Sequence, residues 1–330
     1  MVVSRIEEFP RIALIGCGRW GKNIARSLSA AGALELIVDP YADALTGLAK
    51  DLGARLSNKL ADAFAPHIRA VAIAAPAVQH ASLVRRALLA GKHVFVEKPL
   101  AMDVSEAEEL AALADERELT LMVGHLLQYH PAFLELCRQV ERGAIGEVRH
   151  VSSNRLNPGA IRIEENALWS MAPHDFSMIL GLLGGYPEVV DALAVRVVDP
   201  MIPDQFFVHM RFGEFVTGQA NVSWLSPYKE HKLTVLGTRG ALVFEDTVAD
   251  PERRLLLYRD YVDAQGRVPA FVKGPGEPVP YERIEPLLNE MRWFLDCVEA
   301  KRRPRSGPAE AIPVLRLLRD ASAAAGLAVA

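Results

Sequence analysis

The order of hydrophobic and polar positions divides the chain into two parts. In the first third, short apolar runs alternate with amphipathic segments of helical period. Nearly continuous apolar strands separated by helices predict a parallel sheet that is covered on both faces. The apolar runs cover residues 11–16, 34–39, 71–76, 93–99 and 119–125, and the helical patterns cover 21–32, 80–91 and 103–118.

After about residue 145 the pattern changes to longer strands separated by turns. We therefore predict an α/β Rossmann domain over residues 1–125 and an α+β domain with an open, mainly antiparallel sheet over 126–330. The C-terminal helix, 308–328, could pack back on the first domain. Candidate strands lie at 147–156, 189–198, 205–212, 215–224, 231–246 and 253–259, with helices at 172–184, 287–300 and 311–326.

The composition narrows the class of protein. The 330 residues are 50% hydrophobic and 24% charged, with a net charge of −4 and a pI near 6.2. This balance indicates neither a nucleic-acid partner nor a membrane surface. Three widely spaced cysteines predict no disulfide framework and no zinc site, and we expect no metal. The first ten residues lack a signal-peptide pattern, and no apolar run has the length of a membrane span, so we expect a cytoplasmic protein.

A glycine pattern joins the first strand to the first helix. Gly16, Gly18 and Gly21 have the G-x-G-x-x-G spacing within "IALIGCGRWGKN". Glycines at these places allow a tight turn, close approach of a pyrophosphate and close packing of helix on strand. The N-terminus of the helix then offers N–H donors to the phosphates. The pattern predicts a dinucleotide site.

Asp39 bears on the choice of cofactor. It ends the second strand 18 residues after Gly21 (39 − 21), near the spacing of an acid that binds the ribose 2′-hydroxyl. A carboxylate there would repel a 2′-phosphate, and the next three residues offer no cation to neutralise one. We predict NAD rather than NADP.

The stretch "HVFVEKPLAM" ends an apolar strand in a charged pair and a proline. Ligands of a doubly wound sheet bind outside the carboxyl ends of its strands, which is where Lys98 would emerge. Desolvation there would lower the pKa of the lysine, and its ammonium could donate a hydrogen bond to a reacting oxygen. From the residues alone, a surface turn and a catalytic site are equally good explanations. The sequence leaves open the isomer of the Lys98–Pro99 bond and whether Glu97 pairs with Lys98, contacts the cofactor or caps the strand.

Three segments, "GCGRWG", "AGKHVFVEKPLA" and "APHDFSMIL", resemble the glucose–fructose oxidoreductase, inositol dehydrogenase and rhizopine catabolism (Gfo/Idh/MocA) family. The resemblance covers essentially the whole chain and implies a Rossmann domain followed by an α+β domain. It places Lys98 beside the nicotinamide and the substrate, and His174 on a helix of the second domain. An imidazole is suited to take the proton of an alcohol. The predicted cofactor-binding residues are Gly16, Gly18, Arg19, Trp20, Gly21, Asp39, Ala75, Pro76, His80, Glu97 and Lys98.

The chain departs from the polyol dehydrogenases of this family in two places. Those enzymes often carry an aspartate four residues before the histidine, and another downstream of it. Ser170 and Ser177 stand at these positions here. A simple cyclitol dehydrogenase is therefore disfavoured, and the group that orients His174 is left open.

Other segments, "GHLLQYHPAF" and "SNRLNPGAIRIEENALWSMAPHD", resemble the nucleotide-sugar dehydrogenases of the family. These include enzymes that oxidise the 3-hydroxyl of UDP-N-acetylglucosamine or of its uronic acid. His231 and Lys232, beside Lys229, are further candidates to meet a diphosphate. The predicted substrate-binding residues are Tyr129, His130, Arg155, Asn157, Arg162, Trp169, His174 and Lys229.

The resemblance implies an NAD-dependent dehydrogenase that makes a 3-keto UDP-sugar for a downstream aminotransferase, toward lipid A or surface polysaccharide. A dehydrogenase for the uronic acid, a free-sugar or cyclitol dehydrogenase, an NAD-dependent glycosidase and a non-catalytic NAD-binding protein are the alternatives. The coexistence of Lys98 and His174 disfavours the last. An open sheet face would favour a homodimer or homotetramer.

Overall fold

The computed structural model forms two compact units. The first comprises the chain up to Tyr129 together with Ile284–Ile312, and the second comprises His130–Arg283 and the segment after Pro313. The predicted division at residue 125 assigned 126–129 and 284–312 to the second domain, whereas both segments group with the first unit. The first nine residues lie outside the described part of the chain. The structure describes residues 10–159, 161–163, 165–259, 262–263, 267–268, 270–271 and 275–327.

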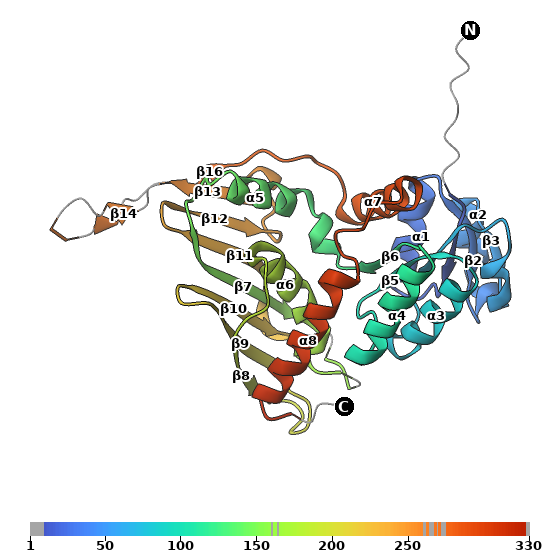
Figure 1. The fold of residues 1–330 in the computed structure, drawn as a ribbon, viewed down its shortest axis with the longest axis horizontal. Helices are drawn as coiled ribbons and strands as arrows, with labels where there is room; N and C mark the ends of the chain where they lie inside the picture. Colours follow the sequence, from blue (N-terminus) through green and yellow to red (C-terminus); the bar gives the residue numbers. More distant parts are fainter. Residues whose placement is uncertain are drawn as a thin grey trace, which may run out of the picture. The chain divides into compact units, whose positions relative to one another are not determined.

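The first unit contains a six-stranded parallel sheet of order β3-β2-β1-β4-β5-β6 (Figure 1). The strands β1, β4 and β6 are buried over their whole length, as expected of a sheet covered on both faces. The strand order reverses between β1 and β4, where doubly wound sheets bind ligands. The strands are β1 (Ile12–Ile15), β2 (Leu34–Val38), β3 (Arg55–Ser57), β4 (Ala70–Ile73), β5 (His93–Glu97) and β6 (Leu121–Gly124).

The helices of the first unit follow the predicted periodicity closely. The side chain of Asp103 accepts hydrogen bonds from the N–H groups of Ser105 and Glu106, and so caps α4. The short helix α2 and strand β3 have no counterpart in the predicted pattern. The helices are α1 (Gly21–Ala30), α2 (Thr46–Leu52), α3 (His80–Leu89), α4 (Val104–Glu116) and α7 (Pro286–Ala300), with single turns η1 (Ala42–Leu45), η2 (Leu60–Phe64), η3 (Ala77–Gln79) and η4 (Leu126–Tyr129).

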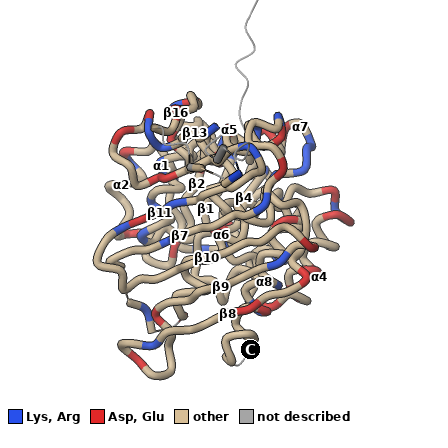
Figure 2. The backbone as a smooth tube through the Cα atoms, turned by 90° about the vertical axis from the view of Figure 1, so that its left-hand side faces the viewer, with Lys and Arg blue, Asp and Glu red and all other residues tan. Residues whose placement is uncertain are grey.

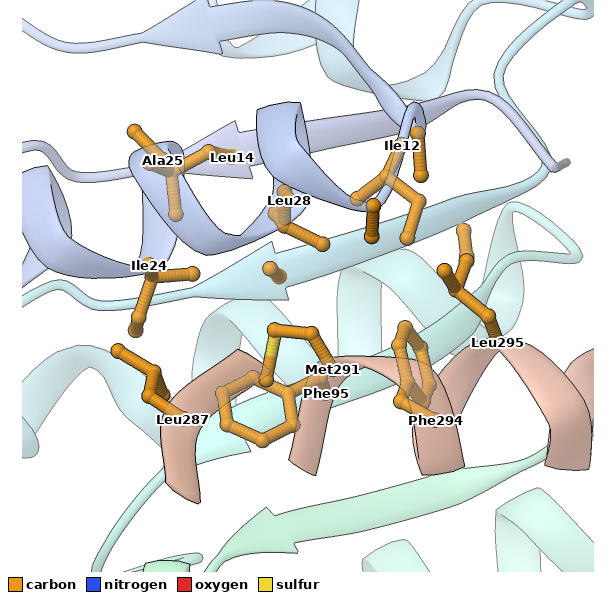
Figure 3. Packing of buried hydrophobic residues seen from close by; sticks show 14 of the residues in the cluster. Ile12, Leu14, Ile24, Ala25, Leu28, Phe95, Leu287, Met291, Phe294 and Leu295 are labelled. Atoms are coloured by element: carbon orange, nitrogen blue, oxygen red, sulfur yellow. The ribbon is translucent and has the colours of Figure 1, made fainter. Parts of the chain in front are cut away.

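Helix α7 joins the first unit through its apolar face. Met291 and Phe294 point toward α1 and toward Phe95 of β5 (Figure 3). The rings of Phe95 and Phe294 are 5.9 Å apart between centroids. Burial of a large apolar side chain stabilises a fold by about 1.5–3 kcal/mol. This contact with the sheet explains why the segment belongs to the first unit despite its distance along the chain.

The second unit contains an eight-stranded sheet of order β16-β13-β12-β11-β7-β10-β9-β8. Neighbouring strands are antiparallel, except that β7 and β10 pair in parallel. This confirms the predicted fold class of a Rossmann domain and an α+β domain. The strands are β7 (Val148–Pro158), β8 (Val189–Val195), β9 (Gln205–Phe212), β10 (Val216–Ser223), β11 (Leu225–Gly237), β12 (Gly240–Glu245), β13 (Leu255–Arg259) and β16 (Glu277–Pro278), beside a separate pair β14 (Val262–Asp263) and β15 (Ala270–Phe271).

Helix α6 (Ala167–Leu183) packs on β7, β9 and β10, and α5 (Pro131–Glu141) packs on β12. Helix α6 begins five residues before the predicted start (172 − 167), because the side chain of Asn166 accepts a hydrogen bond from the N–H of Trp169. Pro173 therefore lies inside the helix, where it removes one backbone donor. Helix α8 (Pro308–Ala324) starts in the segment of the first unit and continues in that of the second.

The strand β10 carries no lysine, arginine or acidic residue and is tan throughout in Figure 2. Its side chains alternate between the face under α6 and the opposite face, where Thr217 is exposed. Within the described residues, no helix combines the length and hydropathy of a bilayer-spanning segment.

Candidate active site

The loop between β1 and α1 has the geometry of a phosphate-binding turn. Gly16 has φ +86°, and a Cβ there would lie 2.9 Å from the main chain of Ala74. A Cβ on Gly21 would lie 2.4 Å from the carbonyl oxygen of Gly16. A Cβ on Gly18 would meet no atom within 4 Å among the described residues, so the loop leaves open space there. These positions therefore need glycine for three different reasons, as a dinucleotide site does.

The helix α1 presents its N-terminus to this loop without a side-chain cap among the described residues. Trp20 precedes the helix and, like Arg19, is exposed. The first N–H groups of a helix carry partial positive charge and suit an anionic group. The residues of the loop thus fit the pyrophosphate of a dinucleotide.

Asp39 follows β2 and is fixed by two main-chain donors. Its carboxylate accepts hydrogen bonds from the N–H of Cys17 at 2.7 Å and from the N–H of Tyr41 at 2.8 Å. The acid is half-buried, so oxygen lone pairs can face a ligand as well. This fixed negative charge suits a ribose hydroxyl and opposes a phosphate ester.

His80 holds two loops of the first unit together. Its Nδ1 lies 2.7 Å from the carbonyl oxygen of Pro99, and its Nε2 lies 2.8 Å from that of Ala75. The ring is 1% exposed, and burial lowers its pKa. Both ring nitrogens face main-chain oxygens, so His80 fixes the loops after β4 and β5 and does not reach out to a cofactor. Ala75 and the exposed Pro76 form the surface of the first of these loops.

The Glu97–Lys98–Pro99 segment stands at the carboxyl end of β5, and the Lys98–Pro99 bond is cis. Glu97 accepts a hydrogen bond from the indole Nε1 of Trp20 at 2.6 Å and one from the N–H of Lys98 at 3.3 Å. The glutamate therefore joins the glycine loop to the strand that carries the lysine. Its carboxyl group occupies the space over Gly124, where a Cβ would lie 3.1 Å away. Burial raises the pKa of Glu97, while the bond to Trp20 and the charge of Lys98 lower it.

Tyr129 lies in the core of the first unit. Its ring is fully buried, and its hydroxyl lies 3.0 Å from Oγ of Ser306 and accepts a hydrogen bond from the N–H of that residue at 2.9 Å. Burial raises the pKa of the phenol. The sequence placed this side chain at the substrate cleft, whereas the structure gives it a packing role.

In the second unit, His174 projects from α6 next to a buried ion pair. Asp175 is 0% exposed and accepts hydrogen bonds from Nε of Arg155 at 2.7 Å and from Oγ of Ser153 at 2.5 Å. Both donors are on β7, so the pair fixes the helix to the sheet at the turn that carries His174. His174 itself is half-buried, and its Nδ1 is shielded from solvent. This ion pair fixes the backbone turn of α6 that carries His174.

Arg155 is therefore a different kind of residue from the one predicted. Its side chain is 9% exposed and paired with Asp175, so the predicted substrate donor is a support for α6. Asn157, two residues further along β7, accepts a hydrogen bond through its Oδ1 from Nε2 of His231 on β11 at 3.1 Å. Burial and the charges of Arg155 and Lys229 lower the pKa of His231 to about 3. His231 is thus neutral, while Lys229 is exposed and retains its place as a candidate for an anionic group.

The remaining predicted substrate residues of the second unit make contacts within it. His130 is 3% exposed, caps α5 through its Nδ1 and lies 3.4 Å from Asp246 through its Nε2. Trp169 donates its indole N–H to Oγ of Ser322 at 3.1 Å. Arg162 is paired with Glu165, and Lys232 lies 3.0 Å from Glu245. Lys232 thus has an acidic partner within the sheet.

Two acids that support these groups, Asp175 and Asp246, are not among the predicted site residues. Asp175 lies inside the segment "APHDFSMIL", where only the histidine was given a role, and Asp246 directly follows β12 and belongs to no motif. A signal did exist for Glu290, which stands in the apolar period of α7 between Leu287 and Phe294. A charged residue at a core position of an amphipathic helix is uncommon and indicates a special environment. Among the described residues, no cluster of three or more potential ligands could hold a metal ion.

Comparison with known proteins agrees with this geometry. Residues 10–125 match an oxidoreductase family with an NAD-binding Rossmann fold, Gfo/Idh/MocA, and residues 133–243 match a C-terminal domain of the same family. The chain is 30% identical over 310 residues to the UDP-N-acetylglucosamine 3-dehydrogenase of Acidithiobacillus ferrooxidans, which covers 88% of this chain and 90% of that one. It is 32% identical over 201 residues to an inositol 2-dehydrogenase of Rhizobium meliloti, covering 59% of this chain and 61% of that one.

Among solved structures, GenD2 from gentamicin A biosynthesis in complex with NAD superposes with a TM-score of 0.81 and 25% identity. The superposition covers 98% of this chain and 96% of that one. The glycine loop, the fixed Asp39 and the charged end of β5 thus occur in a chain that matches this family in both of its domains. The protein belongs to the Gfo/Idh/MocA family of oxidoreductases, and its cofactor is NAD.

Proposed function

We propose that the protein oxidises the C3 hydroxyl of a UDP-N-acetylhexosamine, with UDP-N-acetylglucosamine as the first candidate, to the 3-keto sugar. The observation that supports this most is the similarity to a UDP-N-acetylglucosamine 3-dehydrogenase over 88% of the chain. The presence of both Lys98 and His174, at the positions that resemble those of the family's catalytic residues, supports oxidation as the reaction.

The proposed roles follow from the chemistry of each side chain. Lys98 donates a hydrogen bond to the hydroxyl oxygen and stabilises the negative charge that develops there. His174 takes the hydroxyl proton, and the proposal places that proton on Nε2 because Nδ1 is shielded from solvent. Bound NAD supplies the acceptor for the hydride that leaves the carbinol carbon. General base catalysis of this kind contributes about 10²–10⁴ in rate.

Of the two arginines predicted to bind the sugar, Arg155 favours a neutral sugar over a uronate. Arg155 is buried and paired with Asp175, so it is not available as a dedicated partner for a sugar carboxylate. Arg162 forms only a partly exposed pair with Glu165 and does not discriminate between the two sugars. A cyclitol dehydrogenase is the second candidate, because several relatives are inositol dehydrogenases. The serines at positions 170 and 177, in place of the acids of polyol enzymes, weigh against it.

The product of this reaction fits an aminotransferase as the next enzyme. A 3-keto sugar offers the carbonyl carbon that transamination requires, and the resulting 3-amino sugar could enter lipid A or surface polysaccharide.

The test is a substrate panel. NADH formation is followed by absorbance with UDP-N-acetylglucosamine, UDP-N-acetylglucosaminuronate, free N-acetylglucosamine and inositols, with and without a 2-oxo acid that reoxidises bound NADH. We expect turnover with UDP-N-acetylglucosamine and its loss in His174→Asn, which should still bind NAD. Turnover confined to inositols would refute the proposal, and full activity of His174→Asn would remove that residue from the mechanism.

A further inference from the structure

A carboxyl group lies in the interior of the first unit without a hydrogen-bond partner. Glu290 on α7 is 0% exposed. Neither of its carboxylate oxygens makes a hydrogen bond among the described residues. It shares the face of the helix that carries Leu287, Met291 and Phe294 into the core. An ionised carboxylate in such a place is strongly disfavoured, so this group is neutral in the structure.

The groups around Glu290 add to this preference. The negative charges of Glu97 on β5 and Glu285 on α7 act with burial to raise its pKa well above the usual value. On η4, the phenol of Tyr129 is held by Ser306 and is itself fully buried. Helix α1, which also packs on α7, presents apolar side chains of the same core cluster.

Glu97 differs from Glu290 in its hydrogen bonds. Burial raises the pKa of Glu97 as well, but its carboxylate accepts hydrogen bonds from Trp20 and from the N–H of Lys98. These bonds and the charges of Lys98 and His125 act against that rise. The two glutamates therefore interact through their charges, and only Glu97 has hydrogen-bond donors among the described residues. When environments differ in this way, the proton is held by the member without donors.

We propose that Glu290 carries the proton of a Glu97–Glu290 pair and that binding of NAD⁺, but not of NADH, expels this proton. The inference rests on the proposed function in one respect, namely that the nicotinamide binds beside Lys98. The oxidised nicotinamide ring is positive and the reduced ring is neutral, so only the former favours a second carboxylate nearby. The proton passes to solvent, and no covalent bond other than O–H changes.

The same coupling must act in both directions. Raising the pH removes the proton from Glu290 and should therefore strengthen binding of NAD⁺ relative to NADH. Lowering the pH should do the reverse. Glu290 thus acts through the charge at the end of β5 and sets the balance between the two forms of the cofactor, without touching substrate.

The test is calorimetry of NAD⁺ and NADH binding to the whole protein, without sugar, in two buffers of different ionisation enthalpy. For the wild type we expect more protons to be released with NAD⁺ than with NADH. We also expect the ratio of the two dissociation constants to change by about fivefold or more across the pH range of release, the lower end of typical couplings between sites. Glu290→Gln should abolish both effects. Glu299→Gln, which removes an exposed charge from the same helix, should leave both unchanged.

Equal proton release with both cofactors in the wild type, or a pH-dependent affinity ratio that persists in Glu290→Gln, would overturn the inference. If Glu290→Gln does not fold, infrared difference spectra of the wild type decide. Addition of NAD⁺ should remove a carbonyl band of a protonated carboxyl group, and its persistence would refute the assignment. These measurements use no UDP-sugar and are therefore independent of the substrate panel. If the panel refuted the proposed substrate, the number of protons released on cofactor binding would still test this inference.

Discussion

Replacing Asp175 by alanine should lower the free energy of unfolding of the second unit by far more than the loss of a surface ion pair would. The carboxylate is completely buried and accepts hydrogen bonds from Arg155 and Ser153. In Asp175→Ala the guanidinium of Arg155, only 9% exposed, would be left without its counter-charge. Removal of one partner from a buried pair costs about 3–5 kcal/mol, most of it the penalty for the remaining charge.

Two further variants separate the loss of the hydrogen bonds from the penalty for the unpaired charge of Arg155. Asp175→Asn keeps the shape and one acceptor, and should cost about 1.5–3 kcal/mol, the value of a hydrogen bond to a charged group. The double variant Arg155→Met/Asp175→Leu removes both charges and should be more stable than Asp175→Ala, because no unpaired charge is left. Glu165→Ala, which breaks the partly exposed pair with Arg162, should cost about 0–1 kcal/mol.

The assay is urea unfolding followed by circular dichroism, with the free energy taken from the midpoint and the slope. Turnover of the Asp175 variants at low urea reports separately on His174, since the pair fixes the turn of α6 that carries it. If Asp175→Ala cost less than about 1 kcal/mol, the pair would behave like an exposed one and the reasoning would be wrong.

Five other variants test the cofactor site and His231 on the sheet of the second unit. Gly18→Ala should leave the melting temperature unchanged but weaken NAD binding, because a Cβ there meets no described atom. Gly21→Ala should lose about 1–3 kcal/mol of stability, because its Cβ would lie 2.4 Å from a main-chain oxygen. Asp39→Ala should weaken NAD binding by about 10–100-fold, equivalent to one charged hydrogen bond, and should reduce the preference for NAD over NADP in measured dissociation constants. Lys98→Met should lower kcat by about 10²-fold or more while the dissociation constant of NAD changes little. His231→Gln should lose less stability than the wild type on acidification from pH 6.5 to about 3, because in the wild type the unfolded chain protonates His231 there and the folded protein does not. An unchanged dependence of the unfolding free energy on pH in this range would contradict this.

Local signals account for what the sequence could predict. The apolar runs, the glycine spacing and the Asp103 cap each depend on residues close in the chain, and the first unit has the strands they indicate. The strands of the second unit were also indicated, because alternation is a local property. The Lys98–Pro99 segment was placed at the end of its strand for the same reason.

Contacts between distant segments could not be predicted. Nothing near residue 290 indicates that α7 packs on the Rossmann sheet, since its apolar face would suit either unit. Arg155 and Tyr129 were assigned to the substrate because their segments resemble those of nucleotide-sugar dehydrogenases, but in the structure both side chains are buried and bonded within their own units. His80 was assigned to the cofactor, but its ring nitrogens lie against main-chain oxygens 5 and 19 residues away, which the sequence does not indicate.

The parallel pairing of β7 with β10 has a consequence for the order of assembly. The two strands meet in register at His150 and Thr217, 67 residues apart (217 − 150), and the chain between them contains α6, β8 and β9. Closing a loop of this length costs conformational entropy, and only contacts between distant segments, which form late in folding, compensate for it. The helix that bears His174 lies within this crossover and packs on both paired strands as well as on β9. Partial unfolding from the β8 edge should therefore proceed inward strand by strand, and the histidine should lose its place only when β10 separates from β7.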